Sequence, residues 1–585
     1  MTKGPETNGS IRRILRPQNL EAADRLSREI GIPHALGRVL AARGVTDVDV
    51  GRRHLDPAGG DLYDPFEMAG VAEAVERLAE TAQHGGRVVV FGDYDCDGVG
   101  AVAILTTVLR RLGADPRPFI PHRLNDGYGL RPETLERAVS EHEPEGIVTV
   151  DCGITALEPI EVAVRRGLYV IVTDHHLPAA ELPGGGILVD PKLPGCRYPF
   201  KELCGAGIAW KLAEALLLRD GARVGIGEPE RAAWMASLSK IVALATIADM
   251  VPLTGENRTL TSRGLAGLAD PRSPGLAALL RRASIPIGRA PTPAEVAFRI
   301  APRLNAAGRV DHAYASLELL TTSDRGRADE LAAQLEAANT ERRALQERVV
   351  KSVRQRLAAA FDPARDALIV EAGTPEEGWH RGVLGIAASK IAAEFRRPVL
   401  LLSREGETVS GSGRSWGTTP LHERLAPVAG RWATSFGGHS RALGLSVPAA
   451  SWEAFREEAR NAFHAGRDDE EWILEIEIDT ALAPREADLP LARSLGGLEP
   501  HGIGNPRPVF LLRGLSWDGR GRPVGESGIR FAFGSGELRI EAVGWSLGSL
   551  PRAERSGTFD VIAHLADDRF TGGASLTVLG LERAE

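Results

Sequence analysis

Acidic side chains crowd into the segment RVVVFGDYDCDGVG. Asp93, Asp95 and Asp97 alternate directly after Arg87–Phe91, a short run rich in β-branched residues that is typical of a buried parallel strand. The helical spacing of apolar residues over Val99–Leu112 predicts a helix after them. Three carboxylates so close together repel one another unless a cation neutralises their charge. The segment therefore favours a divalent metal site, with solvated aspartates in a polar turn as the alternative reading.

Other polar residues follow further predicted strands and one helix. Gly146–Val150 runs into Asp151, Leu168–Val172 runs into Asp174, His175 and His176, and a helix over Ser237–Ala248 ends at Asp249. In an open α/β sheet, ligands bind at the carboxyl ends of the strands, so we expect these groups to converge. Oxygen ligands with one imidazole favour Mg²⁺ or Mn²⁺, and a shared carboxylate can bridge two ions about 3.5–4 Å apart. The predicted metal site comprises Asp95, Asp97, Asp151, His175 and Asp249, with Asp151 as the candidate bridge.

Two glycine-rich segments and one helical segment carry side chains that suit phosphate. We expect Gly411–Ser415 and Phe436–Arg441 to be loops that approach a ligand closely and offer it N–H groups, hydroxyls and a guanidinium. The alternative is that these glycines only turn the chain. The candidate phosphate-binding residues are Ser412, Arg414, Gly437, Gly438 and His439, with Arg303, Asn305 and Arg309 from the segment APRLNAAGRV.

The arrangement of these elements predicts a multidomain α/β protein. The chain has 585 residues, enough for several domains. Alternating strands and helices predict a parallel sheet, a long amphipathic stripe predicts a connecting helix, and short alternating segments near the end predict a small β-barrel. The expected domains are a helical lead-in over 1–65, a parallel-sheet domain over 66–285, a helical connector over 286–361, a smaller α/β domain over 362–468 and a β-barrel over 469–585.

Composition narrows the class of protein. The content is 43% hydrophobic and 25% charged, as in ordinary globular proteins, and no apolar run is long enough to cross a bilayer. The N-terminal MTKGPETNGSIRRIL lacks the apolar core of a signal peptide, so we expect a cytoplasmic protein. A net charge of −8 argues against a general polyanion binder, although local basic grooves can still bind nucleic acid. The four cysteines form no CxxC pair and suit a reducing compartment.

Several of these segments resemble known motifs. GDYDCDG, VDCG, TDHH and ADMVPL resemble the motifs of DHH phosphoesterases, and RGVLGIAASKI with GGHS resembles the partner domain DHHA1. NDGYGL, PKLPGCRYPFKELCGAGIAWKL, PRLNAAGR and LEPHGIGNPRPVF are similar to segments of the RecJ single-strand-specific exonucleases. The likeness covers nearly the whole chain after about residue 65, with the motifs in the same order.

The resemblance implies a DHH domain, a DHHA1 domain and an oligonucleotide-binding (OB) barrel around a DNA track. It implies a 5′→3′ exonuclease that degrades single-stranded DNA to 5′-mononucleotides in repair and recombination, using two Mn²⁺ or Mg²⁺ ions. Asp95, Asp97, Asp151, His175 and Asp249 would be metal ligands, and His176 would contact the scissile phosphate or assist the leaving group. The phosphate-binding candidates above would hold the DNA. The family also implies a RecQ-type helicase and a single-strand-binding protein as partners. We expect a monomer near the nucleoid without membrane association.

One departure from the family pattern concerns the first metal. Several DHH enzymes carry a histidine at the position of Phe91, which cannot bind metal. Either the first ion is held more weakly, or Asp93 is an additional ligand. Two other functions stay open. One is a DHH/DHHA1 phosphodiesterase acting on short oligoribonucleotides or cyclic dinucleotides, and the other is a catalytically inactive DNA-binding scaffold.

Overall fold

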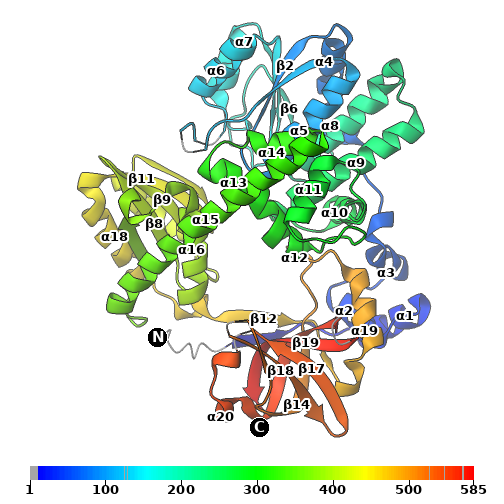
Figure 1. Cartoon of the computed structure of the whole chain (residues 1–585), viewed down its shortest axis with the longest axis vertical. Coiled ribbons are helices and arrows are strands. Elements are labelled where there is room, and N and C mark those ends of the chain that lie inside the picture. Colours follow the sequence, from blue (N-terminus) through cyan, green and yellow to red (C-terminus); the bar gives the residue numbers. More distant parts are fainter. Residues whose placement is uncertain are drawn as a thin grey trace. The chain divides into compact units, whose positions relative to one another are not determined.

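The computed structural model describes residues 11–584, apart from 124, 128, 526, 546 and 569–571. The chain divides into two compact units, which we describe separately. Of the described residues, the first unit contains 63–251 and 263–473, and the second contains 11–62, 252–262 and 474–584. The elements are labelled in Figure 1.

The first unit opens with the predicted parallel sheet. Its strands are β2 (Arg87–Gly92), β3 (Asp115–Phe119), β4 (Gly146–Val150), β5 (Tyr169–Thr173) and β6 (Ile187–Val189). They lie in the order β3-β2-β4-β5-β6, and every pairing is parallel. The chain leaves β2 toward β3 on one side and returns to β4 on the other. The carboxyl ends of β2 and β4 therefore form the switch point at which open α/β sheets bind ligands.

Helices cover both faces of this sheet. The helices α4 (Val71–Gln83), α5 (Cys96–Leu112) and α8 (Gly205–Asp220) pack together on one side, and α6 (Pro132–His142) and α7 (Leu157–Arg165) pack on the other. Helix α9 (Glu228–Ala248) packs against α5 and α8. By length and composition alone α9 could cross a membrane, but 56% of its most apolar window is buried inside the protein. Core packing accounts for its apolar character.

A helical segment follows and ends in one long helix. It comprises α10 (Gly255–Gly267), α11 (Pro274–Arg282), α12 (Pro293–Glu295), the π-helical turn η4 (Val296–Ile300), α13 (Ala301–Val310), α14 (Tyr314–Thr321) and α15 (Arg325–Ala360). The 36-residue α15 begins at the N-cap Asp324, whose side chain accepts from Arg327 N. It contacts α11, α13 and α14 as well as α16 (Arg381–Phe395) of the next lobe. The expected long connecting helix is therefore present.

The second lobe of this unit is a five-stranded mixed sheet in the order β10-β11-β9-β8-β7. Its strands are β7 (Ile369–Gly373), β8 (Val399–Glu405), β9 (Thr408–Arg414), β10 (Ser435–His439) and β11 (Ala442–Pro448). One face packs on α16 and α15, and the other packs on α17 (Leu421–Trp432) and α18 (Trp452–Ala465).

The glycine-rich segments predicted as loops lie mainly within strands β9 and β10, so that prediction was wrong. Gly411 serves close strand pairing rather than turning. A β-carbon on Gly411 would lie 2.0 Å from the carbonyl oxygen of Leu401 on the adjacent strand. Glycine in a strand often marks such a close approach between backbones.

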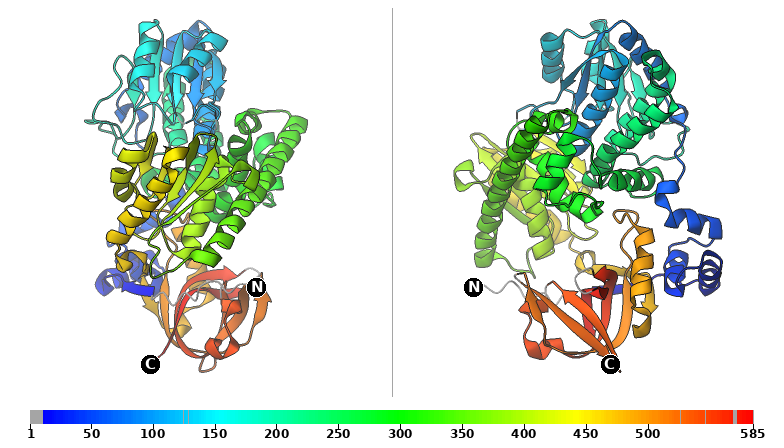
Figure 2. Two further views of the ribbon diagram at one scale, coloured as in Figure 1. Left: turned by 90° about the vertical axis from the view of Figure 1, so that its left-hand side faces the viewer. Right: turned by 45° about the vertical axis from the view of Figure 1, so that its right-hand side comes forward.

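The second unit contains the predicted barrel. Strands β13 (Thr480–Leu482), β14 (Phe510–Asp518), β15 (Arg522–Val524), β16 (Gly528–Ser535), β17 (Leu538–Gly544), β18 (Ser556–Asp568) and β19 (Gly573–Arg583) form one sheet. The pairing of Ser516 with Gly534 joins β14 to β16 and closes it. Figure 2 shows these strands curling into a barrel. The core of the barrel unit includes Trp517, Phe531 and Phe533. Two short helices, α19 (Leu489–Ser494) and α20 (Arg552–Arg555), accompany the barrel.

The N-terminal segment belongs to this second unit. Helices α1 (Leu20–Ile30), α2 (His34–Ala42) and α3 (Val48–Leu55) contribute to the core of the barrel unit or pack against it. The lead-in, expected to be helical, also contains the strand β1 (Ile11–Leu15), which pairs in parallel with β12 (Leu474–Ile478). Although Leu474–Ile478 falls within residues 469–585, which are expected to form the barrel, it therefore lies in a separate two-stranded sheet.

Candidate active site

The turn after β2 is held rigidly by its own carboxylates. Asp95 is the N-cap of α5, and its Oδ1 accepts from Asp97 N at 2.9 Å and from Gly98 N at 3.1 Å. Asn305 of α13 caps the same helix, because its Oδ1 accepts from Cys96 N at 2.6 Å. An N-cap satisfies backbone donors that have no partner within the helix. The candidate ligands in this turn are thus pre-positioned before any metal binds.

Asp97 faces the N-terminus of α8. Its two oxygens accept from Gly205 N and Ala206 N, both at 2.7 Å. Burial, together with the charge of Asp95, raises the pKa of Asp97 to about 6, and the two amides oppose this rise. Helix N-termini favour negative charge, so α8 stabilises the ionised form of this carboxylate.

His175 lies among carboxylates that come from three other places in the sequence. Its Nε2 lies 3.1 Å from Asp151 Oδ1, 3.8 Å from Asp97 Oδ2 and 3.7 Å from Asp249 Oδ2. Burial, followed by the neighbouring His176, lowers the pKa of His175 to about 3. The imidazole is therefore neutral near pH 7, as a metal ligand must be.

The carboxylates themselves carry more negative charge than the protein compensates. Burial and the neighbouring carboxylates raise the pKa values of Asp93 and Asp151 well above the usual value, and raise the pKa of Asp249 to about 8. Asp93 Oδ1 is buried and has no hydrogen-bond partner in the described part of the chain. A buried acceptor without a donor, amid like charges, is the setting that a cation relieves.

The ligand atoms fall into groups compatible with two ions. Asp93, Asp95 and Asp151 form one group, and Asp97, His175 and Asp249 form another; within each group the candidate atoms lie within 4.8 Å of one another. Asp151 belongs to the first group, yet its Oδ1 lies only 3.1 Å from Nε2 of His175, which belongs to the second group. It therefore occupies the position expected of a bridging carboxylate.

The structure also shows what stands in place of the missing histidine. Phe91 is fully buried and stacks on Phe119, with ring centroids 5.3 Å apart. It belongs to the core of the sheet and not to the site. Asp93, two residues later, lies among the acidic group, as expected if it supplies the absent ligand.

His176 is arranged to carry a proton. Its Nδ1 lies 2.7 Å from Asp174 Oδ1. Burial alone would lower the pKa of His176, but the hydrogen bond to Asp174 and the charges of Asp174, Asp249 and Asp97 outweigh it and raise the pKa to about 9. The imidazole is therefore protonated near pH 7 and remains partly exposed, with its side chain 35% accessible.

Arg309 and Arg123 lie near the acidic groups, and Arg342 and Arg414 lie near Arg309. Burial, followed by the charges of Arg123, Arg342 and Arg414, lowers the pKa of Arg309 to about 9, and the charge of Asp95 opposes this fall. Arg123 stacks on Tyr94 at 4.7 Å and also opposes the rise in the pKa of Asp93. Guanidinium groups held together in this way suit the bidentate binding of phosphate oxygens.

Arg123, Arg309, Arg342 and Arg414 form an arginine cluster, and the sequence analysis did not predict two of its members, Arg123 and Arg342. Arg123 follows β3 by a few residues, so the strand-end argument that found the aspartates could also have found it. Arg342 lies within α15, where no local pattern distinguishes it from the other arginines of that helix.

Register places most of the predicted phosphate-binding residues of the second lobe on one face. Ser412 pairs with Gly444, which pairs with Gly437, while Arg414 pairs with Ala442, which pairs with His439. Directly paired residues share a face of a sheet. Helix α16 lies over the same face, and a β-carbon on its Gly385 would lie 2.9 Å from Arg414 Nη2. Gly438 pairs with Leu443 and so belongs to the opposite face.

Arg303 and Asn305 lie differently from the other candidates. Arg303 forms an ion pair with Glu336 of α15 and donates to the carbonyl of Arg299. Asn305 is engaged at the N-terminus of α5, as described above. In this structure both residues fasten α13 to its neighbours, whereas Arg309 of the same helix joins the arginine cluster.

Known families match three separate parts of this chain. Residues 87–246 match the DHH family, N-terminal domain; residues 366–465 match the DHHA1 domain; and residues 478–579 match the RecJ OB domain.

Curated relatives named single-stranded-DNA-specific exonuclease RecJ align over most of the chain. The Escherichia coli protein is 34% identical over 82% of this chain and 83% of its own length, and the Thermus thermophilus protein is 37% identical over 85% and 70%. The Bacillus subtilis protein is 33% identical over 90% of this chain, which spans 64% of that protein. A crystal structure of Thermus thermophilus RecJ in complex with Mn²⁺ superimposes with a TM-score of 0.80 at 31% identity, covering 98% of this chain and 80% of that one.

Proposed function

The chain belongs to the RecJ family of single-stranded-DNA-specific exonucleases, and we propose that it removes nucleotides from the 5′ end of single-stranded DNA as 5′-mononucleotides. The observation that carries this proposal is the position of Asp151. It lies at the switch point of the sheet, in the Asp93 group and 3.1 Å from the His175 group. One carboxylate between two ligand groups is the arrangement of two-metal phosphoryl hydrolases.

The cofactor is Mn²⁺ or Mg²⁺, the ions present in crystal structures of Thermus thermophilus RecJ. We propose two ions, one held by Asp93, Asp95 and Asp151 and one by Asp97, Asp151, His175 and Asp249. When bound, such ions activate a water molecule and neutralise charge on the phosphate. The neutral imidazole of His175 and the amides that hold Asp97 keep both side chains ready as ligands.

The remaining residues of the site orient the strand and supply a proton. We propose that His176, protonated through its contact with Asp174, hydrogen-bonds the scissile phosphate and protonates the departing oxygen. Arg309, Arg414 and Ser412 would bind the terminal 5′-phosphate, because the arginine cluster adjoins the acidic groups. Holding the strand end beside the ligand groups would favour release of one nucleotide at a time.

The test is the digestion of labelled oligonucleotides with Mn²⁺ or Mg²⁺. A 3′-labelled single strand should give a descending ladder, a 5′-labelled strand should give labelled mononucleotide at once, and a blunt duplex should stay intact. The variant Asp151→Asn should be inactive while still binding DNA. Cleavage restricted to a diribonucleotide would replace this proposal with the short-substrate phosphodiesterase, and DNA binding without any cleavage by the wild type would replace it with the scaffold.

We further propose a cellular setting for this activity, supported by the family alone. The protein would act in the cytoplasm, near the nucleoid, on intermediates of DNA repair and recombination. A helicase of the RecQ type would supply single strands, and a single-strand-binding protein would present them. Co-purification of either protein with the intact chain, in a nuclease-treated extract, tests these partners.

A further inference from the structure

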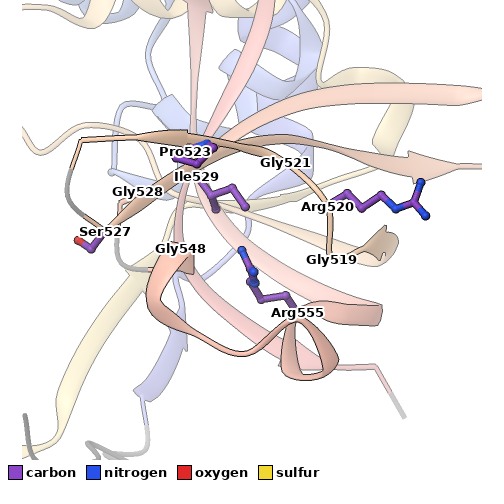
Figure 3. Close-up of a pocket in the computed structure, with 9 residues that line it drawn as sticks. All are labelled: Gly519, Arg520, Gly521, Pro523, Ser527, Gly528, Ile529, Gly548 and Arg555. Atoms are coloured by element: carbon purple, nitrogen blue, oxygen red, sulfur yellow. The ribbon is translucent and has the colours of Figure 1, made fainter. Parts of the chain in front are cut away.

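The barrel unit contains a pocket of about 440 Å³ that the proposed chemistry does not use. Its walls come from three places: the turn that follows β14, the hairpin of β15 and β16, and the segment between β17 and β18. Figure 3 shows the lining residues Gly519, Arg520, Gly521, Pro523, Ser527, Gly528, Ile529, Gly548 and Arg555. The volume lies within the range of about 300–1,000 Å³ that is typical of small-ligand sites.

Arg555 is the charged group directed into this pocket. Its side chain rises from α20 toward Ile529, whereas the side chain of Arg520 extends away (Figure 3). The Nε of Arg555 is buried and has no hydrogen-bond partner among the described residues. The guanidinium lies 6.0 Å from the Trp517 ring centroid, which supports it from one side. A buried donor without an acceptor is costly, and a ligand that accepts this hydrogen bond would remove the cost.

The other lining groups define the charge and shape of the ligand. None of the described residues that line the pocket is acidic, so an anion would meet no like charge on its walls. Pro523 and Ile529 add an apolar surface beside the guanidinium. The pocket is also much larger than an inorganic phosphate needs. An anionic group joined to an apolar or planar body fits these features better than a simple anion.

The backbone around the pocket is tightly packed and therefore pre-formed. A β-carbon on Gly548 would lie 2.6 Å from the carbonyl oxygen of Ser527, and one on Gly528 would lie 2.5 Å from that of Val524. Trp517 Nε1 donates to the carbonyl of Arg520 at 2.8 Å and fixes the turn after β14. In oligonucleotide-binding barrels, loops that join the strands take part in binding oligonucleotides.

We propose that this pocket binds one nucleotide, with its phosphate on Arg555 and its base against Pro523 and Ile529. This inference adds a nucleotide-binding site to the proposed function, and it rests on that function only for the assumption that the bound strand is single-stranded DNA. Two sources share this chemistry: a nucleotide within the bound single strand, or a free mononucleotide such as the product. In the first case the pocket grips the strand within the barrel unit.

The binding experiment compares Arg555→Gln with the matched control Arg520→Gln in the full-length protein. Arg520 also lines the pocket, but its side chain is 75% exposed and lies 3.8 Å from Asp518. Anisotropy of fluorescent (dT)30 is measured in EDTA, where no cleavage occurs. Losing a hydrogen bond to a charged group should weaken binding about tenfold in Arg555→Gln, and loss of the exposed arginine should change it less than about twofold. Arg555→Lys keeps the charge and should recover part of the affinity, and thermal unfolding verifies that each variant is folded.

Further measurements distinguish a nucleotide within the strand from a free mononucleotide, and the pocket proposal from the proposed exonuclease activity. Calorimetric titration with dTMP should show binding that depends on Arg555 if the pocket takes free nucleotide, and no binding if it takes only nucleotides within a strand. With Mn²⁺, Arg555→Gln should hydrolyse (dT)4 as the wild type does while its KM for (dT)30 rises about tenfold. If the wild type itself hydrolyses neither substrate, the proposed function is refuted, but the result of the binding experiment still stands. Equal affinities of wild type and Arg555→Gln for both (dT)30 and dTMP, or equal losses in the Arg555 and Arg520 variants, would overturn the pocket assignment.

Discussion

Replacing Gly205 by alanine should damage the metal site while the chain stays folded. A β-carbon at this position would lie 2.6 Å from Asp151 Cβ and 2.7 Å from Asp151 Oδ1. Carbon atoms in favourable contact lie about 3.5–4.0 Å apart. The variant must therefore absorb a displacement of about 1 Å between the N-terminus of α8 and Asp151.

Neither side of this contact can move without moving a candidate ligand. The backbone of Asp151 has a φ of 61° and its N–H donates to Thr173 O at 3.0 Å, which ties it to the neighbouring strand end. The N-terminus of α8 is tied to Asp97 through Gly205 N and Ala206 N. A misplacement of about 1 Å at a reacting centre can lower the rate about 100-fold, or about 2.7 kcal/mol of transition-state stabilisation.

The assay is kcat/KM on 3′-labelled (dT)30 as a function of Mn²⁺ concentration, with thermal unfolding to confirm folding. Gly207→Ala is the matched control, because its β-carbon would first meet the side chain of Leu203 at 3.3 Å, where a flexible side chain can yield. We expect a loss of about 100-fold in Gly205→Ala and less than about threefold in Gly207→Ala. Equal activities of the two variants would refute the reasoning, as would wild-type activity in Gly205→Ala.

Three further outcomes follow from the structure. Asp174→Asn should lower the pKa of His176, so kcat should fall more at pH 8.5 than at pH 6.5; pH profiles of unchanged shape would contradict the role of this pair. Arg414→Gln should raise KM about tenfold for a 5′-phosphorylated strand and leave KM for a 5′-hydroxyl strand nearly unchanged, and an equal rise for both would count against a terminal-phosphate contact. Burial and neighbouring arginines lower the pKa of His54 to about 4 and that of His501 to about 3, so between about pH 6.5 and 4 the unfolded chain binds more protons than the folded one. The free energy of unfolding should therefore fall as the pH falls through this window, and each kcal/mol lost should lower Tm by about 2–4 °C. The fall in Tm with pH should be smaller in His501→Asn. If the slope of Tm against pH is identical in the variant and the wild type, this cause is excluded.

Local sequence predicts the strands and the groups at their ends. A run of β-branched residues followed by polar residues identifies β2, β4 and β5, because a buried parallel strand must be apolar throughout and its loop must be polar. The expected barrel and the long connecting helix depend on similar short-range patterns, with periods of two and about 3.6 residues. These features are visible without knowledge of the fold because they are properties of single elements.

The local sequence does not predict which residues an arginine or a glycine will contact in the folded protein. Arg303 and Arg309 lie in the same helix, yet the first pairs with Glu336 and the second joins the arginine cluster. Gly411 looks like a loop residue until the close approach of Leu401 explains it. In each case the neighbour comes from an element distant in the sequence, so the periodicity of the segment itself carries no information about it.

The sequence alone determined which residues could bind a metal and at which strand ends they stand, because those positions follow from hydrophobic pattern and residue type. Tertiary structure alone decided which of these residues come together in each ligand group and which one lies between the two groups. The order β3-β2-β4 places Asp151 beside Asp93 and Asp95, while His175 and Asp249 approach it through β5 and α9. Packing of α8 then supplies the amides that hold Asp97. A bridging carboxylate is defined by distances between elements, and those distances exist only once the sheet and its helices have packed.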